Sequence, residues 1–129
     1  MGDPTFLSLE DVLEMHAASL RRWGGTEGVR DQHALESAIG MPQQTFGDEY
    51  LHDDIFSMAA AYAFHIGEAQ AFLDGNKRTG VLAAVIFLDI NDIRIVEQDD
   101  LVYLAMIEIA ERKRTKGELA NLLRELAGV

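Results

Sequence analysis

The sequence predicts an all-α fold: a compact bundle of about six helices around a buried central helix, in a single domain spanning residues 1–129. Two observations support this prediction. Apolar residues recur at the three- and four-residue spacing of a helix through most of the chain, and capping residues or glycines separate the periodic segments. The run from Val81 to Leu88 is also apolar nearly all round, which is typical of a helix buried on every side.

Most of the predicted helices begin at a residue whose side-chain oxygen can accept a hydrogen bond from a first-turn N–H group. Ser8 with Asp11, and Thr115 with Glu118, also have the spacing of a capping box. Residues 91–97 are compatible with a short extended excursion. In chain order, the predicted helices run from Ser8 to about Arg22 (ended by Trp23-Gly24-Gly25), from Asp31 to Gly40, from Asp53 or Asp54 through Ile66, from about Asn76 to Ile90, from Asp99 or Asp100 through Ile109, and from Thr115 through Leu126.

The composition excludes several classes of function. The net charge is −11, from 11 Lys and Arg against 22 Asp and Glu, which argues against direct binding to nucleic acid or to anionic membranes. The absence of cysteine excludes disulfides, thiolate catalysis and cysteine-ligated zinc. The N-terminus lacks the apolar region of a signal peptide, and the longest apolar run is far shorter than a membrane span. We therefore expect a cytoplasmic protein.

The segment AQAFLDGNKRTG, residues 69–80, has the pattern of a loop that opens onto the N-terminus of the buried helix. The exposed N–H groups at such an end form an anion site, and phosphate is a common occupant. Lys77 and Arg78 would lie in the first turn, where cations oppose the helix macrodipole and are mildly destabilising. Fold stability alone does not favour this placement, whereas a bound phosphate does.

Each position of this loop has a chemical interpretation. Asp74 offers a hard carboxylate that can hold Mg²⁺, and Gly75 permits a positive φ or close approach of the backbone. Asn76 can cap the helix and offer its amide to a phosphate oxygen. Arg78 can grip phosphate with its planar fork, and Lys77 supplies a flexible point charge. The residues alone leave open a simpler interpretation, in which the segment is only a helix-starting turn and both cations extend into solvent.

The same segment resembles the signature of the Fic/Doc superfamily, His-x-Phe-x-Asp/Glu-Gly-Asn-x-Arg. It resembles the Doc branch, the "death on curing" toxins, more closely, because it reads DGNKRT. The likeness extends upstream through residues 24–46 and so covers most of the chain. The positions that match the signature are Phe72, Asp74, Gly75, Asn76 and Arg78, and Lys77 and Thr79 give the segment its Doc character.

The resemblance implies a Fic/Doc-like helical bundle whose loop binds the phosphates of ATP. It implies Asp74 as the Mg²⁺ ligand, with Gly75, Asn76, Lys77 and Arg78 on the phosphates. In the Doc branch the implied activity is phosphorylation of a protein hydroxyl, with elongation factor Tu as the target. A toxin of this kind also implies a partner, a Phd-type antitoxin that folds onto the domain and blocks the site.

Residues 41–53 are polar and mixed, without a clear period, and we expect a short extended flap there. In position this segment corresponds to the flap that docks target peptides in Fic enzymes. Met41, Gln43, Thr45 and Phe46 would present backbone and side chains to a partner strand. An ordinary surface loop is the alternative.

Two positions depart from the family pattern. Gln70 occupies the position of the signature His, which is the general base for the target hydroxyl, and Gln has no titrating group. Val81 occupies the position of a second Arg that AMP-transferring Fic enzymes carry and that Doc toxins lack, so it argues against AMP transfer.

The loss of a general base costs about 10²–10⁴-fold in rate, although positioning and charge stabilisation supply most of the rate of phosphoryl transfer. Asp74 and Arg78 would then carry the catalytic site, with Gln70 where a base is expected. Three interpretations stay open: a weak kinase, a silent module that binds nucleotide and antitoxin, or a protein disarmed by an engineered change.

The four histidines offer no clear substitute for the missing base. On one continuous helix His65 lies on a different face from Gln70, and its apolar neighbours favour a hydrogen-bonded structural role. We expect His16, His33 and His52 to be surface or interface residues, since no pair of histidines has the spacing of a metal site.

Overall fold

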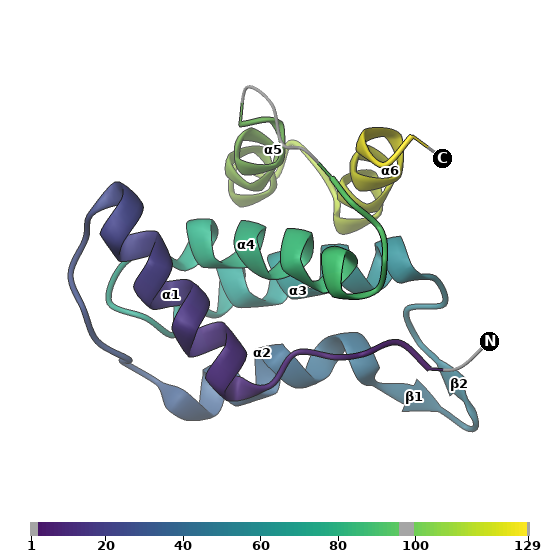
Figure 1. Ribbon diagram of the computed structural model, residues 1–129, viewed down its shortest axis with the longest axis horizontal. Helices are drawn as coiled ribbons and strands as arrows, with labels where there is room; N and C mark the ends of the chain where they lie inside the picture. The colour runs from purple at the N-terminus through teal and green to yellow at the C-terminus, as the bar shows by residue number, and fades with distance from the viewer. Residues whose placement is uncertain (1–2, 96–99, 129) are drawn as a thin grey trace.

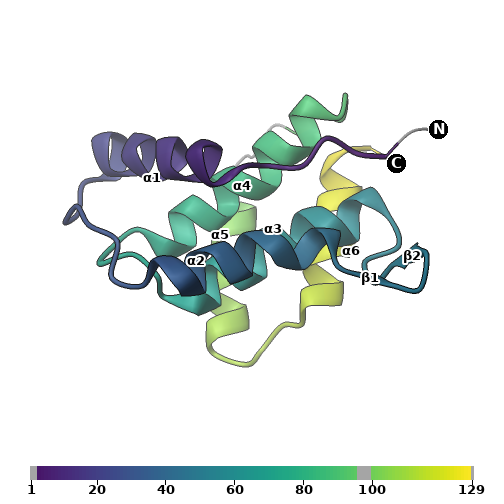
Figure 2. The same ribbon diagram turned by 90° about the horizontal axis from the view of Figure 1, so that it is seen from below.

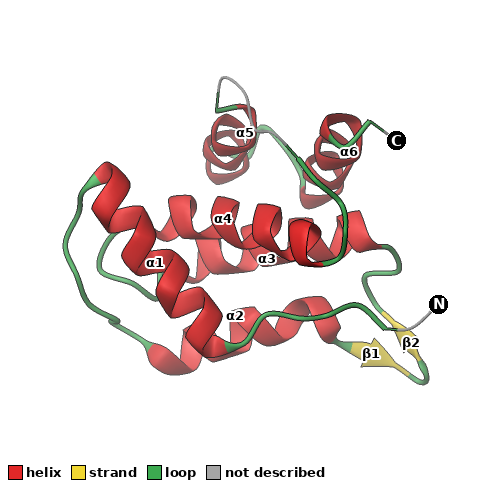
Figure 3. Cartoon of the chain, viewed as in Figure 1, coloured by secondary structure: helices red, strands yellow, loops and turns green. Residues whose placement is uncertain are grey.

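The computed structural model describes residues 3–95 and 100–128, and this part of the chain forms six α-helices and one two-stranded hairpin (Figure 3). The all-α prediction is confirmed. None of the helices in these two ranges is long and apolar enough to cross a membrane. In chain order the elements are α1 (Leu9–Trp23), α2 (Gln32–Gly40), a 3₁₀ turn (Met41–Gln43), β1 (Thr45–Phe46), β2 (Glu49–Tyr50), α3 (Ile55–Ala69), α4 (Asn76–Ile90), α5 (Leu101–Ala110) and α6 (Lys116–Leu126).

The helices α3 and α4 pack against each other at the centre of the molecule. Figure 1 shows α5 and α6 on one side of this pair and α2 with the hairpin on the other side. Seen from below, α2 runs alongside α3, while α1 packs on α4 (Figure 2). The predicted central helix is thus confirmed as α4, which shares the centre with α3. The loop between these two helices, residues 70–75, is the segment that carries the candidate site.

Small side chains let the backbones of α3 and α4 approach closely. Ala63 on α3 is fully buried, and a Cβ placed on Gly80 of α4 would lie only 2.7 Å from the Ala63 carbonyl oxygen. Larger side chains then fill the space around this contact: Tyr62 of α3 and Phe87 of α4 are both fully buried, with ring centroids 5.0 Å apart. The close packing of the pair sets where the first turn of α4 lies.

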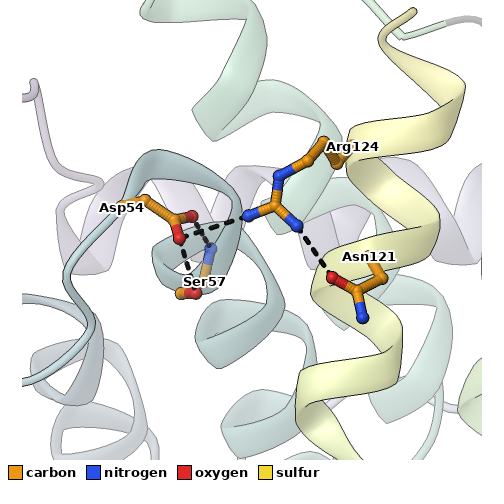
Figure 4. Close-up of polar contacts among 4 residues, drawn as sticks. All are labelled: Asp54, Ser57, Asn121 and Arg124. Carbon is orange, nitrogen blue, oxygen red and sulfur yellow. Dashed lines mark hydrogen bonds and ion pairs between the residues drawn. The ribbon is translucent and has the colours of Figure 1, made fainter. Parts of the chain in front are cut away.

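Four of the predicted N-caps are confirmed, with Asp54 rather than Asp53 at the start of α3. Asp54 Oδ1 accepts the Ser57 N–H at 2.8 Å, and its Oδ2 lies 3.2 Å from Arg124 Nη2 on α6 (Figure 4). Arg124 also donates to Asn121 Oδ1 at 2.8 Å. One carboxylate therefore caps α3 and attaches α6 to it. The other confirmed caps are Ser8 and Thr115, each in a capping box, and Asp31.

Three details differ from the sequence predictions or refine them. The N-cap of α4 is Gly75, with φ of 78°, instead of Asn76. Asp100 precedes α5 as expected, but it has φ of 53° and its side chain makes no capping bond; the alternative start, Asp99, lies outside the described residues. Residues 91–92 form a turn and 93–95 have no regular structure, and the rest of the expected excursion lies outside the described residues.

The predicted flap is confirmed as a minimal hairpin. β1 and β2 pair antiparallel, with Thr45 opposite Tyr50 and Phe46 opposite Glu49. The Phe46 side chain is 81% exposed, which is unusual for an aromatic residue in a domain with a well-formed core.

Candidate functional site

A cavity of about 520 Å³ lies at the N-terminus of α4. Its volume falls in the range of about 300–1,000 Å³ that small-molecule sites occupy. All six site residues predicted from the sequence line this cavity, so the fold brings them together. The walls come from the end of α1 and the residues after it (Trp23, Gly24, Gly25), the loop before α4 (Gln70, Leu73, Asp74, Gly75), the first turn of α4 (Asn76, Lys77, Arg78) and Tyr103 of α5.

Backbone pairing holds the loop against the segment that precedes α2. Val29 and Phe72 form an antiparallel bridge, and the Leu73 N–H donates to the Gly28 carbonyl at 3.0 Å. Phe72 is fully buried, as expected of a hydrophobic anchor. On the other side of the bridge, the Ala71 carbonyl accepts the N–H groups of the two residues directly before α2, at 2.7 and 3.1 Å. The loop is therefore part of a small two-stranded structure, with both of its ends fastened to helices.

His16 of α1 also holds this loop in place, from inside the protein. This finding corrects the expectation that His16 is a surface or interface residue. Its ring is 94% buried and stacks on Phe72 with centroids 3.7 Å apart and an interplanar angle of 9°. Its Nε2 lies 2.8 Å from the Asp74 carbonyl oxygen. Because a carbonyl only accepts, Nε2 carries the proton in this contact. The packing of α1 across the loop, which no local pattern encodes, buries this side chain.

The Asn76 side chain holds the loop instead of capping α4. The residue is buried, its Oδ1 accepts the Phe72 N–H, and its Nδ2 donates to the Phe72 carbonyl, each at 3.0 Å. This paired contact closes the turn and uses one of the two amide hydrogens. The contribution of Asn76 to an anion in the cavity would therefore come mainly from its backbone N–H in the first turn of the helix.

Asp74 presents an exposed carboxylate at the cavity wall, and two backbone groups orient it. Oδ1 accepts the Gly75 N–H at 2.9 Å, and Oδ2 accepts the Thr26 N–H at 3.3 Å. A Cβ on Gly25 would lie 2.9 Å from Oδ2, so the loop after α1 fits tightly around the carboxylate. Residues 3–95 and 100–128 contain no cluster of three His, Asp or Glu groups able to hold a metal ion. A single protein carboxylate nevertheless suits Mg²⁺, which usually binds one or two carboxylates together with substrate phosphates and water.

Lys77 and Arg78 occupy the first turn of α4, as predicted. The first intrahelical donor is the Thr79 N–H, which bonds to the Gly75 carbonyl at 2.9 Å, so the preceding N–H groups are those that a helix end offers to an anion. Arg78 does not extend freely into solvent: its side chain is 22% exposed, and its Nη1 lies 3.5 Å from Asp100 Oδ1.

Gln70 ends α3 at the edge of the cavity in a left-handed conformation, with φ of 52°. Its side-chain Nε2 donates to the Gly67 carbonyl at 3.0 Å, and its own carbonyl accepts the Arg30 guanidinium. The amide therefore satisfies a carbonyl of the last helical turn, which otherwise has no intrahelical partner. Nothing at this position can titrate, so the site has no general base where the family signature places one.

The structural role predicted for His65 is confirmed. Its Nε2 lies 3.3 Å from Lys116 Nζ, which also lies 3.0 Å from His52 Nε2. Burial, together with the charges of Lys116 and His52, lowers the pKa of His65 to about 4. His52 is half-buried in this cluster rather than at the surface, and burial lowers its pKa as well. His33 is exposed, as expected. None of these three lines the cavity.

Several residues of the site escaped the sequence predictions. For Trp23, the sequence predicts only the end of a helix. Its position directly before two glycines is a signal that it borders a loop, and this signal could have pointed to it as a candidate site residue. Tyr103 has no local signal, because it reaches the cavity only through the packing of α5. Asp100, which pairs with Arg78 at 3.5 Å, likewise has no local signal for that contact. Val81, at the position of the second family Arg, is 5% exposed and belongs to the core.

Comparison with known proteins shows the family to which the chain belongs. The sequence profile of the Fic/DOC family matches residues 6–88, a range that contains the loop and the first turn of α4. The chain is 30% identical over 122 residues to the protein named "Protein kinase doc" of Escherichia phage P1, which covers 95% of each chain. It is 34% identical over 125 residues to the protein named "Toxin Doc" of Mycolicibacterium smegmatis, which covers 95% of this chain and 92% of that protein. The chain therefore belongs to the Fic/Doc family.

Proposed function

We propose that this protein is a Doc-like toxin that uses Mg-ATP to phosphorylate a hydroxyl group of a protein, at a rate reduced by Gln70. One observation carries the proposal: Asp74 and the cationic first turn of α4, with Lys77 and Arg78, face one cavity of suitable size. The name of the phage relative, "Protein kinase doc", supports the reaction class.

The residues of the cavity fit a nucleotide with its metal. The helix N–H groups, Lys77 and Arg78 offer positive charge, and the Asp74 carboxylate offers a hard oxygen ligand beside them. This carboxylate would hold Mg²⁺, which supplies charge neutralisation on the phosphate oxygens when bound. Arg78 would hold a phosphate by its planar group, and the backbone of Gly75 and Asn76 would lie along the phosphates without a side chain intervening.

Gln70 determines how fast such a site could work. It cannot accept the proton of the target hydroxyl, and loss of a general base costs about 10²–10⁴-fold. Phosphoryl transfer depends mostly on positioning and on charge stabilisation, and Asp74, Lys77 and Arg78 supply both. We therefore propose slow transfer rather than none.

A second candidate function is a silent module that binds nucleotide and antitoxin without chemistry. The contact between Gln70 Nε2 and the Gly67 carbonyl favours it, because the amide is engaged by the end of α3 rather than directed at a substrate. AMP transfer of the Fic type is a weaker candidate, because Val81 is buried in the core and supplies no second cation.

The proposed partners follow from family membership. By resemblance, the target is elongation factor Tu and the inhibitor is a Phd-type antitoxin that covers the site, both in the cytoplasm. The exposed hairpin offers a place for the target, since β1 and β2 are short edge strands and β1 carries the exposed Phe46.

Mass spectrometry of elongation factor Tu after incubation with the protein and Mg-ATP tests these functions. Added phosphate supports the kinase, added AMP supports the Fic reaction, and an unmodified target together with measurable ATP binding supports the silent module. Gln70→His should increase phosphorylation by about 10²–10⁴-fold. Arg78→Ala should abolish any modification, and full activity in that variant would contradict the assigned site. An absence of ATP binding in calorimetry would contradict all three of these functions, because each of them depends on the nucleotide.

A further inference from the structure

Two aromatic rings from distant parts of the chain contact the guanidinium of Arg78. Its Cζ lies 4.5 Å from the centroid of the Trp23 ring and 3.6 Å from that of the Tyr103 ring. Trp23 is the last residue of α1, and Tyr103 lies in the first turn of α5. Both rings also line the cavity. The three side chains therefore form one cluster at the cavity wall, which we call the arginine clamp.

The arginine clamp acts on the orientation of Arg78 more than on its charge. A guanidinium is planar and delocalised, and it packs on aromatic faces while its N–H groups still point outward in its own plane. Long side chains lose considerable rotamer freedom when a ligand orders them, and contacts that order them beforehand reduce that loss. The two ring contacts therefore restrict the rotamers of the Arg78 side chain before a ligand binds, so that binding loses less conformational entropy.

The carboxylate next to the clamp is a weak partner that an anion can replace. Asp100 lies 3.5 Å from Arg78 Nη1, and its side chain is 62% exposed. Exposed ion pairs of this kind contribute little, because solvent screens them. By contrast, an aromatic ring that packs on the face of a guanidinium leaves the N–H edge available to a phosphate, so ring contacts of this kind do not compete with an anion.

We propose that Trp23 and Tyr103 are positioning residues, which hold the Arg78 guanidinium so that its N–H edge meets a phosphoryl group of the nucleotide. The inference rests on the proposed nucleotide site and adds that α1 and α5 complete it. It also explains why arginine suits position 78. Lysine would keep the charge, but it has neither the planar face that the rings contact nor the fork that binds two oxygens.

Calorimetric titration with Mg-ATP tests the clamp through a double-mutant cycle. Trp23→Leu and Tyr103→Leu should each weaken ATP binding by about two- to fivefold, which is the worth of an exposed cation–π contact. Neither change should weaken binding further in an Arg78→Ala background, which has no cation for the rings to hold. Trp23→Phe and Tyr103→Phe should stay within about twofold of the wild type, because they keep a ring face. An equal loss in both backgrounds, or no loss in either Leu variant, would overturn the inference.

Two controls separate this inference from the proposed function. Arg22 also lies over the Trp23 ring, at 4.9 Å, but does not line the cavity, so Arg22→Gln should leave ATP affinity unchanged. If Arg78→Ala binds ATP as the wild type does, the proposed site is wrong. If Arg78→Ala loses affinity while the Leu variants do not, only the positioning role is wrong. A dicarbonyl reagent with peptide mapping gives a second readout without nucleotide: Arg78 should react faster in Trp23→Leu, and an unchanged rate counts against the clamp.

Discussion

Replacement of Gly80 by alanine should move α4 and weaken both the fold and the site. The new Cβ would lie 2.7 Å from the Ala63 carbonyl oxygen, whereas close C···O contacts lie at about 3.3 Å or more. The two helices would have to separate locally by roughly 0.6 Å at a contact with the backbone, which no side-chain rotation relieves. Overpacking against the backbone costs about 2–3 kcal/mol, and the better helix propensity of alanine returns about 1 kcal/mol. We expect a net loss of about 1–2 kcal/mol.

Urea denaturation measures this loss of free energy directly. For a domain of this size, the melting temperature of Gly80→Ala should also be about 3–8 °C lower than that of the wild type. ATP affinity should fall as well, because Gly80 lies only two residues after Arg78, which lines the cavity. Gly67→Ala on α3 is the matched control. Its Cβ would meet only the terminal methyl of Met106, at 2.5 Å, and that group can rotate away. Gly80→Ala would refute the argument if it were as stable as the wild type, or if it lost less free energy of unfolding than Gly67→Ala.

Three further predictions concern charges and hydrogen bonds near the same elements. Burial and the charge of Lys116 lower the pKa of His65 to about 4 in the folded protein, against about 6.5 in the unfolded chain. Between pH 6.5 and 4 the unfolded chain therefore binds more protons than the folded protein, so the free energy of unfolding falls as the pH falls. After allowance for the partial exposure of His65, we expect a loss of about 1–2 kcal/mol over this range. The urea midpoint of His65→Gln should depend less on pH than that of the wild type, and an equal dependence in the two proteins contradicts this prediction. Asn76→Ala should lower the free energy of unfolding, measured by urea denaturation, by about 2–4 kcal/mol, since it leaves the N–H and C=O of buried Phe72 unpaired. A loss below about 1 kcal/mol would contradict the assigned hydrogen bonds. Asp100→Asn should raise ATP affinity by up to about fivefold in calorimetry without a change in stability. The reason is that it removes an exposed carboxylate that competes with phosphate for the Arg78 guanidinium. Weaker ATP binding in this variant would contradict that competition.

Local signals predicted the helices well because a cap and an apolar period act within a few residues. Ser8 and Thr115 form the expected capping boxes, and Asp31 caps α2 as expected. Asn76 was placed correctly at the first position of α4, but its amide bonds to Phe72 instead of capping the helix. That choice depends on the path of the preceding loop, which the pairing with residues 28–31 sets.

Patterns in the sequence were enough to predict the helical elements, the family, and a loop that carries a carboxylate and two cations at the start of a buried helix. It also identified Gln70 as the residue that stands where a general base is expected. These features follow from residues within about ten positions of one another.

The contacts that hold this loop, and the groups that surround Arg78, follow from the way in which the helices pack. His16 from α1 stacks behind the loop, and Trp23 and Tyr103 reach the guanidinium from α1 and α5. Contacts between residues that lie 55 or 25 positions apart leave no period or cap in the sequence, because they arise when helices pack and not when they form. The chemistry of the site is therefore local in the sequence, whereas its orientation is a property of the fold.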